Sequence, residues 1–309
     1  MIIHEGYENL NLVKPVATLG IFDGVHRGHR TLLDRVVQKA KEEKSESAVI
    51  TFSPHPRLVL EQNNKNLSFL TTIEEKKILL AKAGVDHLII IKFTLEFSNI
   101  PACDFLKDIL VGEIRTKYLV IGHDHHFGRR GEGDFNTIKQ CAKDLDFTVE
   151  QVEGYHTEDG MISSSLIRGA ILNGNIEKAN NWLGYPYSIS GQIIEGRKLG
   201  RKIGFPTANI KPYSEHKLIP ANGVYAVEVQ LDKKVMSGML SIGSNPTVNT
   251  DINFRSIEVH ILNFDEDIYG RNIIVIFRKR LRDEKKFGNI QELAEQMEQD
   301  KQETLRLLT

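Results

Sequence analysis

The sequence contains little of several residue types whose abundance would point to a particular class of protein. It has two cysteines among 309 residues, Cys103 and Cys141, and neither belongs to a CxxC pair. A disulfide framework or a cysteine-rich zinc site is therefore not expected, and the pattern suits a reducing cytosol. The formal net charge is −1. This balance gives no electrostatic reason to expect a nucleic acid or an acidic membrane surface as a partner.

Long apolar runs are also lacking. None approaches membrane-spanning length, and residues 1–14 do not contain the apolar core of a signal peptide. Hydrophobic residues make up 40% of the chain and charged residues 26%, which is typical of a folded globular protein. The length allows two domains, each with its own core. We therefore expect a cytoplasmic protein of two domains.

The first half of the chain alternates short apolar runs with helical patterns. The apolar runs predict strands at residues 16–22, 48–52, 87–93, 118–121 and 147–152. Between them, helical spacing predicts helices at residues 28–43, 73–83, 101–110 and 134–145. This alternation favours an α/β domain with a doubly wound parallel sheet. In such sheets ligands bind at the carboxyl ends of the strands.

The first predicted strand ends in the decapeptide GIFDGVHRGH, residues 20–29. Gly28, at the start of the next helix, would let backbone N–H groups face an anion. His26 and His29 stand beside that helix N-terminus, where they could hold a polyphosphate and stabilise charge on a leaving pyrophosphate. Two surface histidines in a turn are the alternative. The sequence has no GxxxxGK[ST] motif, so a P-loop ATPase is not supported.

Two later stretches also carry polar groups at strand or helix ends. Residues 122–131 form a glycine-hinged, basic and aromatic segment, for which a flexible surface loop is the alternative. The serines of residues 162–168 could cap a helix or, together with Arg168, hold a phosphate. A metal site is a further alternative, although no HExxH or comparable spacing occurs. Its candidate ligands are His55, His123, His125 and His126.

Helical alternation gives way to strands and turns near residues 184–187. We place the boundary there, which gives domains of residues 1–185 and 186–309. Strand-like segments follow at residues 187–194, 223–231, 234–242, 255–262 and 272–281. They predict a mainly-β domain, a small Greek-key-like closed barrel. Residues 289–308 predict a C-terminal helix with an imperfect apolar face.

The stretch GRKLGRKIGFPTAN, residues 196–209, is unlike an ordinary globular sequence. It carries a glycine at every fourth position: Gly196, Gly200 and Gly204. Glycine backbone N–H groups and basic side chains such as Arg201 suit a phosphate. In an extended segment Thr207 and Asn209 face the same side, where their oxygens suit Mg²⁺ carrying a nucleotide. A glycine-rich hairpin with solvated lysines is the alternative.

These motifs resemble those of a known family. GRKLGRKIGFPTAN is similar to the signature of riboflavin kinases. The chain before it resembles the adenylyltransferase half of the bacterial bifunctional riboflavin kinase/FAD synthetases. The decapeptide resembles the HxGH signature of nucleotidyltransferases, GHDHHFG the family's GxDFxFG segment, and SSSLIR its SS[ST]xIR element. The resemblance extends from about Lys14 to the C-terminal helix and departs from the family at His125, where many members have Phe.

For the N-terminal half, the resemblance implies an adenylyltransferase site. His26 and His29 would contact the ATP phosphates and serve as its catalytic residues. Asp124 and Phe127 match the segment that helps to form the flavin and adenine sites. The other residues implied to bind the nucleotide and its phosphates are Gly20, Phe22, Gly24, Gly28, Ser164 and Arg168.

For the C-terminal half, the resemblance implies a kinase whose catalytic base is Glu258, in an ExH motif. On a strand Glu258 faces opposite to Ile257 and Val259, so a solvated charge is the alternative. Thr207 and Asn209 match the positions that bind Mg²⁺ and ATP. The glycine-rich stretch supplies the residues assigned to phosphate: Gly196, Gly200, Arg201 and Gly204. Two residues are assigned to the flavin side: Asn245 and Arg278.

Together these features predict a bifunctional enzyme of flavin-cofactor biosynthesis. The C-terminal domain would phosphorylate riboflavin with Mg-ATP, and the N-terminal domain would transfer AMP from ATP to FMN, giving FAD and pyrophosphate. The expected partners are ATP, riboflavin and FMN, with no nucleic acid and no membrane. One alternative is a riboflavin kinase whose N-terminal half performs a different nucleotidyl transfer. Another is a non-catalytic regulator that binds flavin.

Overall fold

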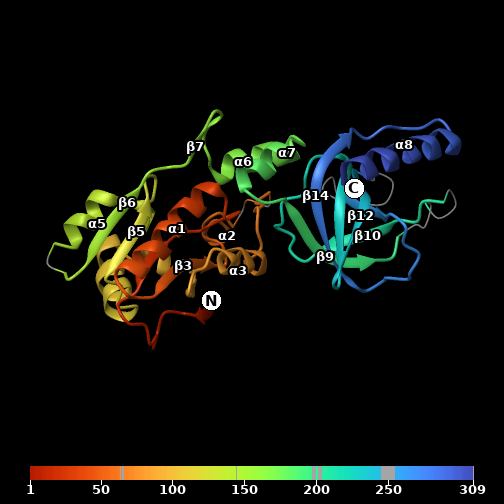
Figure 1. Cartoon of the computed structure of the whole chain (residues 1–309). Helices are drawn as coiled ribbons and strands as arrows, with labels where there is room; N and C mark the ends of the chain where they lie inside the picture. Colours follow the sequence, from red (N-terminus) through yellow and green to blue (C-terminus); the bar gives the residue numbers. More distant parts are fainter. Residues whose placement is uncertain are drawn as a thin grey trace. The chain divides into compact units, whose positions relative to one another are not determined.

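The computed structural model describes two compact units, Met1–Ser164 and Ser165–Thr309 (Figure 1). The described residues are all those of the chain except 63, 65, 144, 197–199, 201–203, 245–254 and 309.

The first unit is built on a six-stranded parallel sheet. In spatial order its strands are β1 (Ile2–Glu5), β4 (His87–Lys92), β3 (Ser47–Ser53), β2 (Val16–Leu19), β5 (Tyr118–Gly122) and β6 (Thr148–Val152). The five predicted strands are all present. The sixth, β1, escaped prediction because it is a short edge strand with mostly exposed side chains. The chain order reverses between β2 and β5, and ligands bind outside such a switch point.

Helices cover both faces of this sheet, which confirms the doubly wound fold. On one face Leu33 of α1 and Leu80 of α3 pack in the same core cluster as Val49 of β3. On the other face Ile109 and Ile138 join the cluster that contains the next residue of β3, Ile50. The helices are α1 (Arg27–Glu42), α2 (Pro56–Leu60), α3 (Ile73–Lys82), α4 (Ala102–Asp104), a π-helical continuation (Phe105–Glu113) and α5 (Phe135–Cys141). Two 3₁₀ turns (Phe97–Asn99, Arg129–Gly131) and a small hairpin of β7 (His156–Thr157) and β8 (Gly160–Met161) complete the unit.

The second unit contains a closed antiparallel barrel. Around the barrel the strands are β10 (Ala208–Pro212), β13 (Arg255–Ile261), β12 (Lys234–Ser244), β11 (Gly223–Leu231), β14 (Asn272–Arg282) and β9 (Ser188–Ile194). Strands β11, β12 and β13 follow one another as hairpins, and β14 returns beside β11. This arrangement is a Greek key, as predicted. The prediction lacked β10, whose first two residues are the last two of the glycine-rich stretch.

Three helices accompany the barrel: α6 (Ser164–Leu172), α7 (Ile176–Leu183) and α8 (Ile290–Leu308). Helix α8 is attached by an ion pair as well as by apolar contacts. The Arg282 guanidinium donates through Nε and Nη2 to both carboxylate oxygens of Asp300, at 2.7 to 3.0 Å. Met297 and Leu305 of the helix pack on the cluster that includes Phe205.

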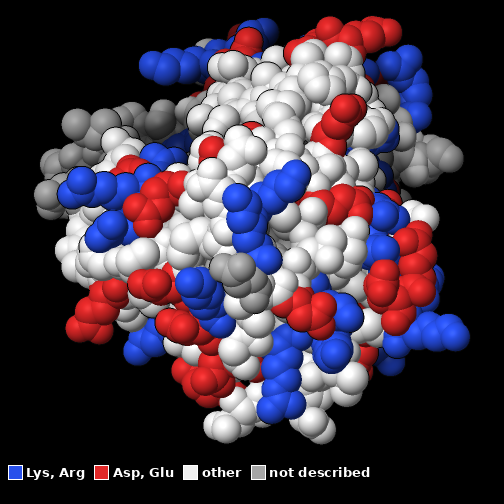
Figure 2. Space-filling view, turned by 90° about the vertical axis from the view of Figure 1, so that its left-hand side faces the viewer, with Lys and Arg blue, Asp and Glu red and all other residues white. Residues whose placement is uncertain are grey.

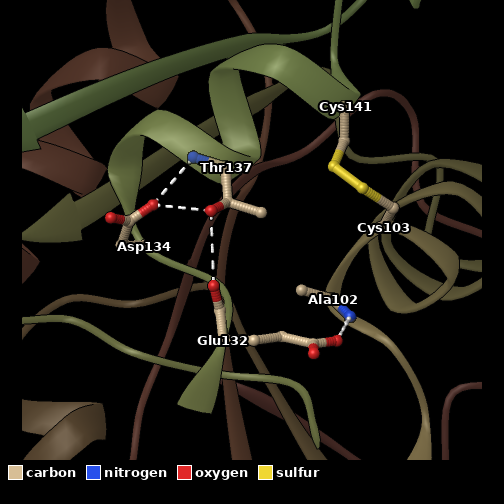
Figure 3. The surroundings of a disulfide bond; sticks show 6 residues. All are labelled: Ala102, Cys103, Glu132, Asp134, Thr137 and Cys141. Carbon is tan, nitrogen blue, oxygen red and sulfur yellow. Dashed lines mark hydrogen bonds between the residues drawn. A yellow bond between two sulfur atoms is a disulfide. The ribbon is translucent and has the colours of Figure 1, made fainter.

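The structure corrects the expectation about the cysteines, because Cys103 and Cys141 form a disulfide (Figure 3). Cys103 lies on α4 and Cys141 ends α5, with their Cα atoms 5.5 Å apart. Beside the bond, the backbone N–H of Ala102 donates to the Glu132 carboxylate at 3.0 Å. The 38-residue separation carries no local sign of this pairing, which arises because both helices pack on the same face of the sheet.

Charge on the surface is mixed in sign. On the face shown in Figure 2 acidic and basic side chains are interspersed. This agrees with the net charge of −1. Of the helices in the described part of the chain, none combines the length and the apolar character that a membrane span requires.

Candidate active sites

The first candidate site is the turn of residues 20–26, which joins β2 to α1. Its backbone takes an unusual course, because Phe22 (φ 50°), Gly24 (φ 84°) and Val25 (φ 37°) all lie in the left-handed region. That region is costly for a residue with a side chain, above all for a β-branched one such as Val25. The surrounding structure must therefore hold the turn in place.

Asp23, which the sequence analysis did not single out, provides part of that support. Its buried carboxylate accepts the backbone N–H groups of Leu70 at 2.9 Å and Thr71 at 3.1 Å. The Thr71 hydroxyl accepts the N–H of Gly24 at 3.0 Å, and the Ser164 hydroxyl donates to the Asp23 carbonyl at 2.9 Å. The structure thus brings Ser164 to the turn. Sequence reasoning missed Asp23 because its partners lie 47 and 48 residues away.

His26 and His29 lie together at the N-terminus of α1. His26 is the N-cap residue, and its Nδ1 accepts the backbone N–H of His29 at 3.3 Å. Because Nδ1 is an acceptor, the proton of the neutral ring is on Nε2. The two rings stack with their centroids 3.7 Å apart. Gly28 permits this position of the His26 ring, since a Cβ there would lie 3.2 Å from it.

Burial keeps both histidines neutral at ordinary pH. It lowers the pKa of His26 to about 4, against a weaker opposing effect of the Asp124 carboxylate. Burial also lowers the pKa of His29 well below its usual range, and the charges of His26 and Lys76 lower it further. Nδ1 of His29 is buried without a hydrogen-bond partner among the described residues. The turn therefore offers neutral imidazoles rather than imidazolium ions.

The other residues predicted to bind the nucleotide are divided between the two units. Phe22 is buried and meets the His29 ring edge to face at 5.2 Å. Gly20 lies beside it, where a Cβ would approach the Phe22 ring to 3.1 Å. Arg168 belongs to the second unit and donates to the Ser165 hydroxyl at 3.0 Å.

In the segment after β5, Asp124 is exposed, whereas Phe127 and the ring nitrogen Nε2 of His125 are buried. Asp124 is exposed and acts electrostatically on His26, so it lies near the turn. Phe127 is buried in the sheet core, with its ring centroid 5.5 Å from that of Phe105. His125 stacks on Phe127 at 5.7 Å, and burial lowers its pKa to about 4. Its Nε2 is buried and has no hydrogen-bond partner within the described part of the chain.

The structure gives no support to a histidine metal site. Among the described residues, no three His, Cys, Asp or Glu side chains gather as ligands. His55 instead caps α2, where its Nδ1 accepts the N–H of Arg57, and it stacks on Phe69 at 4.0 Å.

The second candidate site lies where β10 meets β13 in the barrel. The Thr207 hydroxyl donates to Oε2 of Glu258 at 3.2 Å, and Asn209 is the strand-pair partner of Glu258. Ile257 and Val259 are buried, whereas Glu258 is half-buried and in contact with a polar neighbour. The three polar side chains predicted for catalysis and metal binding are therefore brought together. Hydroxyl and amide oxygens are ligands that a small divalent cation accepts alongside ATP oxygens.

Backbone packing around this cluster depends on two glycines. A Cβ at Gly196 would collide with the side-chain amide of Asn209, and one at Gly200 would collide with the carbonyl of Phe205. The N–H of Phe205 donates to the Gly200 carbonyl at 2.9 Å. Gly204 has φ +82°. Of the described glycines, Gly196 thus lies closely against the side chain of Asn209.

Next to Thr207 the structure forms a small cavity of about 60 Å³. It is lined by residues 206–208, by Val259 and Ile261 of β13, and by residues 264–269. His260 supports this wall, since its Nδ1 lies 2.8 Å from the Pro206 carbonyl oxygen.

Arg278, which was also predicted for the barrel site, is not part of this cluster. Arg278 lies on β14, which pairs with β11 and β9 rather than with β10 or β13. It donates to the Glu228 carboxylate at 2.8 Å. Arg201 and Asn245 lie outside the described residues.

Comparison with known proteins also divides the chain into two parts, each with one candidate site. The family model described as FAD synthetase matches residues 9–166, and the one described as riboflavin kinase matches residues 183–308. A crystal structure recorded as a macrolide-efflux protein from Streptococcus pneumoniae superposes with a TM-score of 0.89 at 30% identity, covering 98% of this chain and 99% of that one.

Curated relatives match over almost the whole length. The bifunctional riboflavin kinase/FMN adenylyltransferase of Listeria monocytogenes is 40% identical, over 94% of this chain and 92% of its own. Those of Escherichia coli K12 and Bacillus subtilis are each 38% identical, with coverages of 92% and 90%, and of 95% and 92%. The chain therefore belongs to the family of bifunctional riboflavin kinase/FMN adenylyltransferases.

Proposed function

We propose that the chain catalyses both reactions of its family at two separate sites. The barrel phosphorylates riboflavin with ATP to give FMN, and the N-terminal domain transfers AMP from a second ATP to FMN, giving FAD and pyrophosphate. The observation that carries this proposal is that two polar clusters, one in each unit, coincide with the two family models. We assign the reactions to domains of residues 186–309 and 1–185. A kinase-only enzyme or a non-catalytic regulator accounts less well for matches to both family models.

In the kinase site, Glu258 acts as the general base. Its carboxylate takes the proton of the ribityl hydroxyl as that oxygen attacks the γ-phosphate of ATP, and ADP leaves. Thr207 holds this carboxylate in position through its hydroxyl proton. The oxygen lone pairs of Thr207 and the amide oxygen of Asn209 stay available to a metal ion.

Enzymes of these two activities use ATP together with a divalent metal ion, and we propose Mg²⁺ for this site. Thr207 and Asn209 supply the hard oxygen ligands that Mg²⁺ accepts while it keeps water and phosphate ligands. When bound, the ion neutralises charge on the phosphate oxygens. The glycine-rich stretch, with Gly196, Gly200, Arg201 and Gly204, supplies N–H groups and positive charge around them.

In the adenylyltransferase site, the FMN phosphate attacks the α-phosphate of ATP and pyrophosphate leaves. His26 donates from Nε2–H, and the N-terminus of α1 presents backbone N–H groups to the phosphates. His29, in the first turn of α1, supplies a second ring nitrogen. Ser164 and Arg168 bind further phosphate oxygens. Because the imidazoles are neutral, they stabilise developing charge as preorganised dipoles.

The flavin contacts and the location of the enzyme remain proposals. We assign Asp124, beside the turn, to the FMN side of the adenylyltransferase site, and Phe127 shapes that side from within the core. Asn245 and Arg278 are assigned to riboflavin in the barrel. A cytoplasmic location stays a prediction from the sequence.

Product analysis tests the two reactions. Purified protein is incubated with ATP and MgCl₂, with riboflavin in one tube and FMN in another, and the flavins are separated by chromatography. We expect FMN and FAD from riboflavin, and FAD from FMN. FMN from riboflavin with no FAD in either tube would leave only a kinase, and no product in either tube would overturn the proposed function.

A further inference from the structure

Lys76 of α3 is a buried cation that neither proposed reaction uses. The residue is 5% exposed, although α3 is otherwise a surface helix with one further buried residue, Leu80. Burying an ammonium group is costly unless something nearby stabilises the charge. The neighbours of Lys76 therefore indicate why a lysine occupies this position.

The ammonium group of Lys76 reaches the strained turn. Its Nζ donates to the carbonyl oxygen of Ile21 at 2.6 Å, and the weaker hydroxyl contact of Thr51 to the same oxygen is 3.4 Å long. The titratable groups that face Lys76 are Asp23, whose carboxylate favours the lysine's charge, and His29, which stays neutral. Lys76 thus contacts the backbone one residue before Phe22, where the left-handed conformation begins.

The turn depends on supports of this kind. Each residue with a side chain held in the left-handed region costs about 1–3 kcal/mol, so Phe22 and Val25 adopt it only under constraint. Asp23 is anchored to Leu70 and Thr71 on one side. Lys76 anchors the opposite end of the same segment, through a charge-assisted bond that is roughly twice as strong as a neutral one.

We propose that Lys76 is a positioning residue of the adenylyltransferase site, which holds the turn of residues 20–26 in the form that places His26 and His29 against the ATP phosphates. The proposal rests on the proposed adenylyl transfer. Lys76 acts through the Ile21 carbonyl and its charge acts on His29, so it does not need to touch the substrate.

A pH dependence follows from the charged form. Burial lowers the pKa of Lys76 to about 8, against the opposing effect of the Asp23 carboxylate. Above that pH the bond to Ile21 loses its charge assistance. FAD formation from FMN should therefore decline on the alkaline side of pH 8. FMN formation in the barrel should not show this decline, because Lys76 belongs to the first unit.

The test compares Lys76→Met, Lys76→Gln and Lys77→Met. Lys77 is the neighbour on the same helix, paired with Glu74 at 2.9 Å, and makes the matched control. For FAD formation from FMN we expect kcat to fall about 100-fold in K76M, because such misplacement of reacting groups typically costs that much. K76Q, which can still donate to the Ile21 carbonyl, should retain more activity and lack the alkaline decline. K77M should match the parent.

Riboflavin phosphorylation by the same samples is the internal control, and thermal unfolding reports whether each variant folds. K76M activity within threefold of K77M would overturn the inference, as would an alkaline decline that persists unchanged in K76Q. If K76M unfolds, the pH profiles of the parent and K76Q decide alone. A parent protein that makes no FAD would contradict the proposed function itself.

Discussion

The two candidate sites differ in the chemical groups that they present to a phosphate. In the N-terminal unit the site is a backbone turn, strained at Phe22 and Val25, with two neutral imidazoles at a helix N-terminus, of which His26 is buried and His29 half-buried. In the barrel the site consists of side-chain oxygens on two paired strands, Thr207 on the approach to β10 and Glu258 on β13. One site offers N–H donors, and the other offers acceptors and metal ligands.

This difference follows from the two reactions. Adenylyl transfer starts from an FMN phosphate that is already ionised, so the site needs no strong base and must stabilise the leaving pyrophosphate. Riboflavin phosphorylation starts from a neutral hydroxyl, so the site needs a carboxylate to take its proton. The comparison can be tested by removing one group from each site and measuring both products.

The largest effect is expected for Glu258→Gln. The amide cannot take the hydroxyl proton but keeps the size of the side chain and can accept the hydrogen bond from Thr207. FMN formation from riboflavin should fall about 1,000-fold, within the range for loss of a general base. Conversion of supplied FMN to FAD, assayed by chromatography, should be unchanged. Loss of both activities in a folded variant would contradict the separation of the sites.

The reciprocal variant is His26→Asn. Asparagine is a favoured N-cap residue, so α1 keeps its cap while the Nε2–H donor is lost. FAD formation from FMN should fall about 100-fold, as for removal of one preorganised donor. Riboflavin phosphorylation should not change. An equal drop in both assays would indicate a general defect instead of a lost donor.

Acid should destabilise the N-terminal unit more than the barrel. The folded-state pKa of His26 is about 4, below the unfolded value of 6.5, so the neutral form is favoured in the folded protein. The contribution of neutral His26 to the free energy of unfolding is fully present above pH 6.5. About 3 kcal/mol of it is lost as the pH falls toward 4. His29 and His125 of the first unit act in the same direction. In the barrel the pKa of His260 is lowered as well, so acid affects that unit through fewer such groups.

Hydrogen exchange measured peptide by peptide separates the two units in this experiment. Protection of β2 and β5 should decrease between pH 6.5 and 4.5 before that of β11 and β12. H26N should weaken the pH dependence of the first unit. Simultaneous loss in both units would show that the buried histidines do not set its acid stability.

The smallest effect is expected for the disulfide. Both cysteines lie in the first unit, so reduction or Cys141→Ser should lower the free energy of unfolding of that unit alone. We expect on the order of 2 kcal/mol, the lower end of the usual range, because α4 and α5 stay packed on a shared core without the bond. Urea unfolding followed by far-UV circular dichroism measures the change. Fluorescence of Trp182, the one tryptophan and a residue of the second unit, should be unaffected.

Predictability differed between elements for identifiable reasons. The buried strands β3 and β4 carry continuous apolar runs, and α3 has the capping box of Thr72 and Glu75, so all three were predicted. The strands β1 and β10 were missed because they are short and partly exposed. Helix α5 was predicted to reach residue 145 but ends at Cys141. In the site, His26 and His29 were found because their spacing is local.

The sequence by itself determined which residues share a face within one segment. Thr207 and Asn209 lie on one side because a strand repeats every two residues, and His29 follows His26 at a helix start because of the helical turn. Tertiary structure alone decided the pairings across the chain: Thr207 with Glu258 over 51 residues, Ile21 with Lys76 over 55, and Cys103 with Cys141 over 38. The physical reason is that backbone geometry sets local periodicity, whereas strand order, register and burial set which distant segments meet.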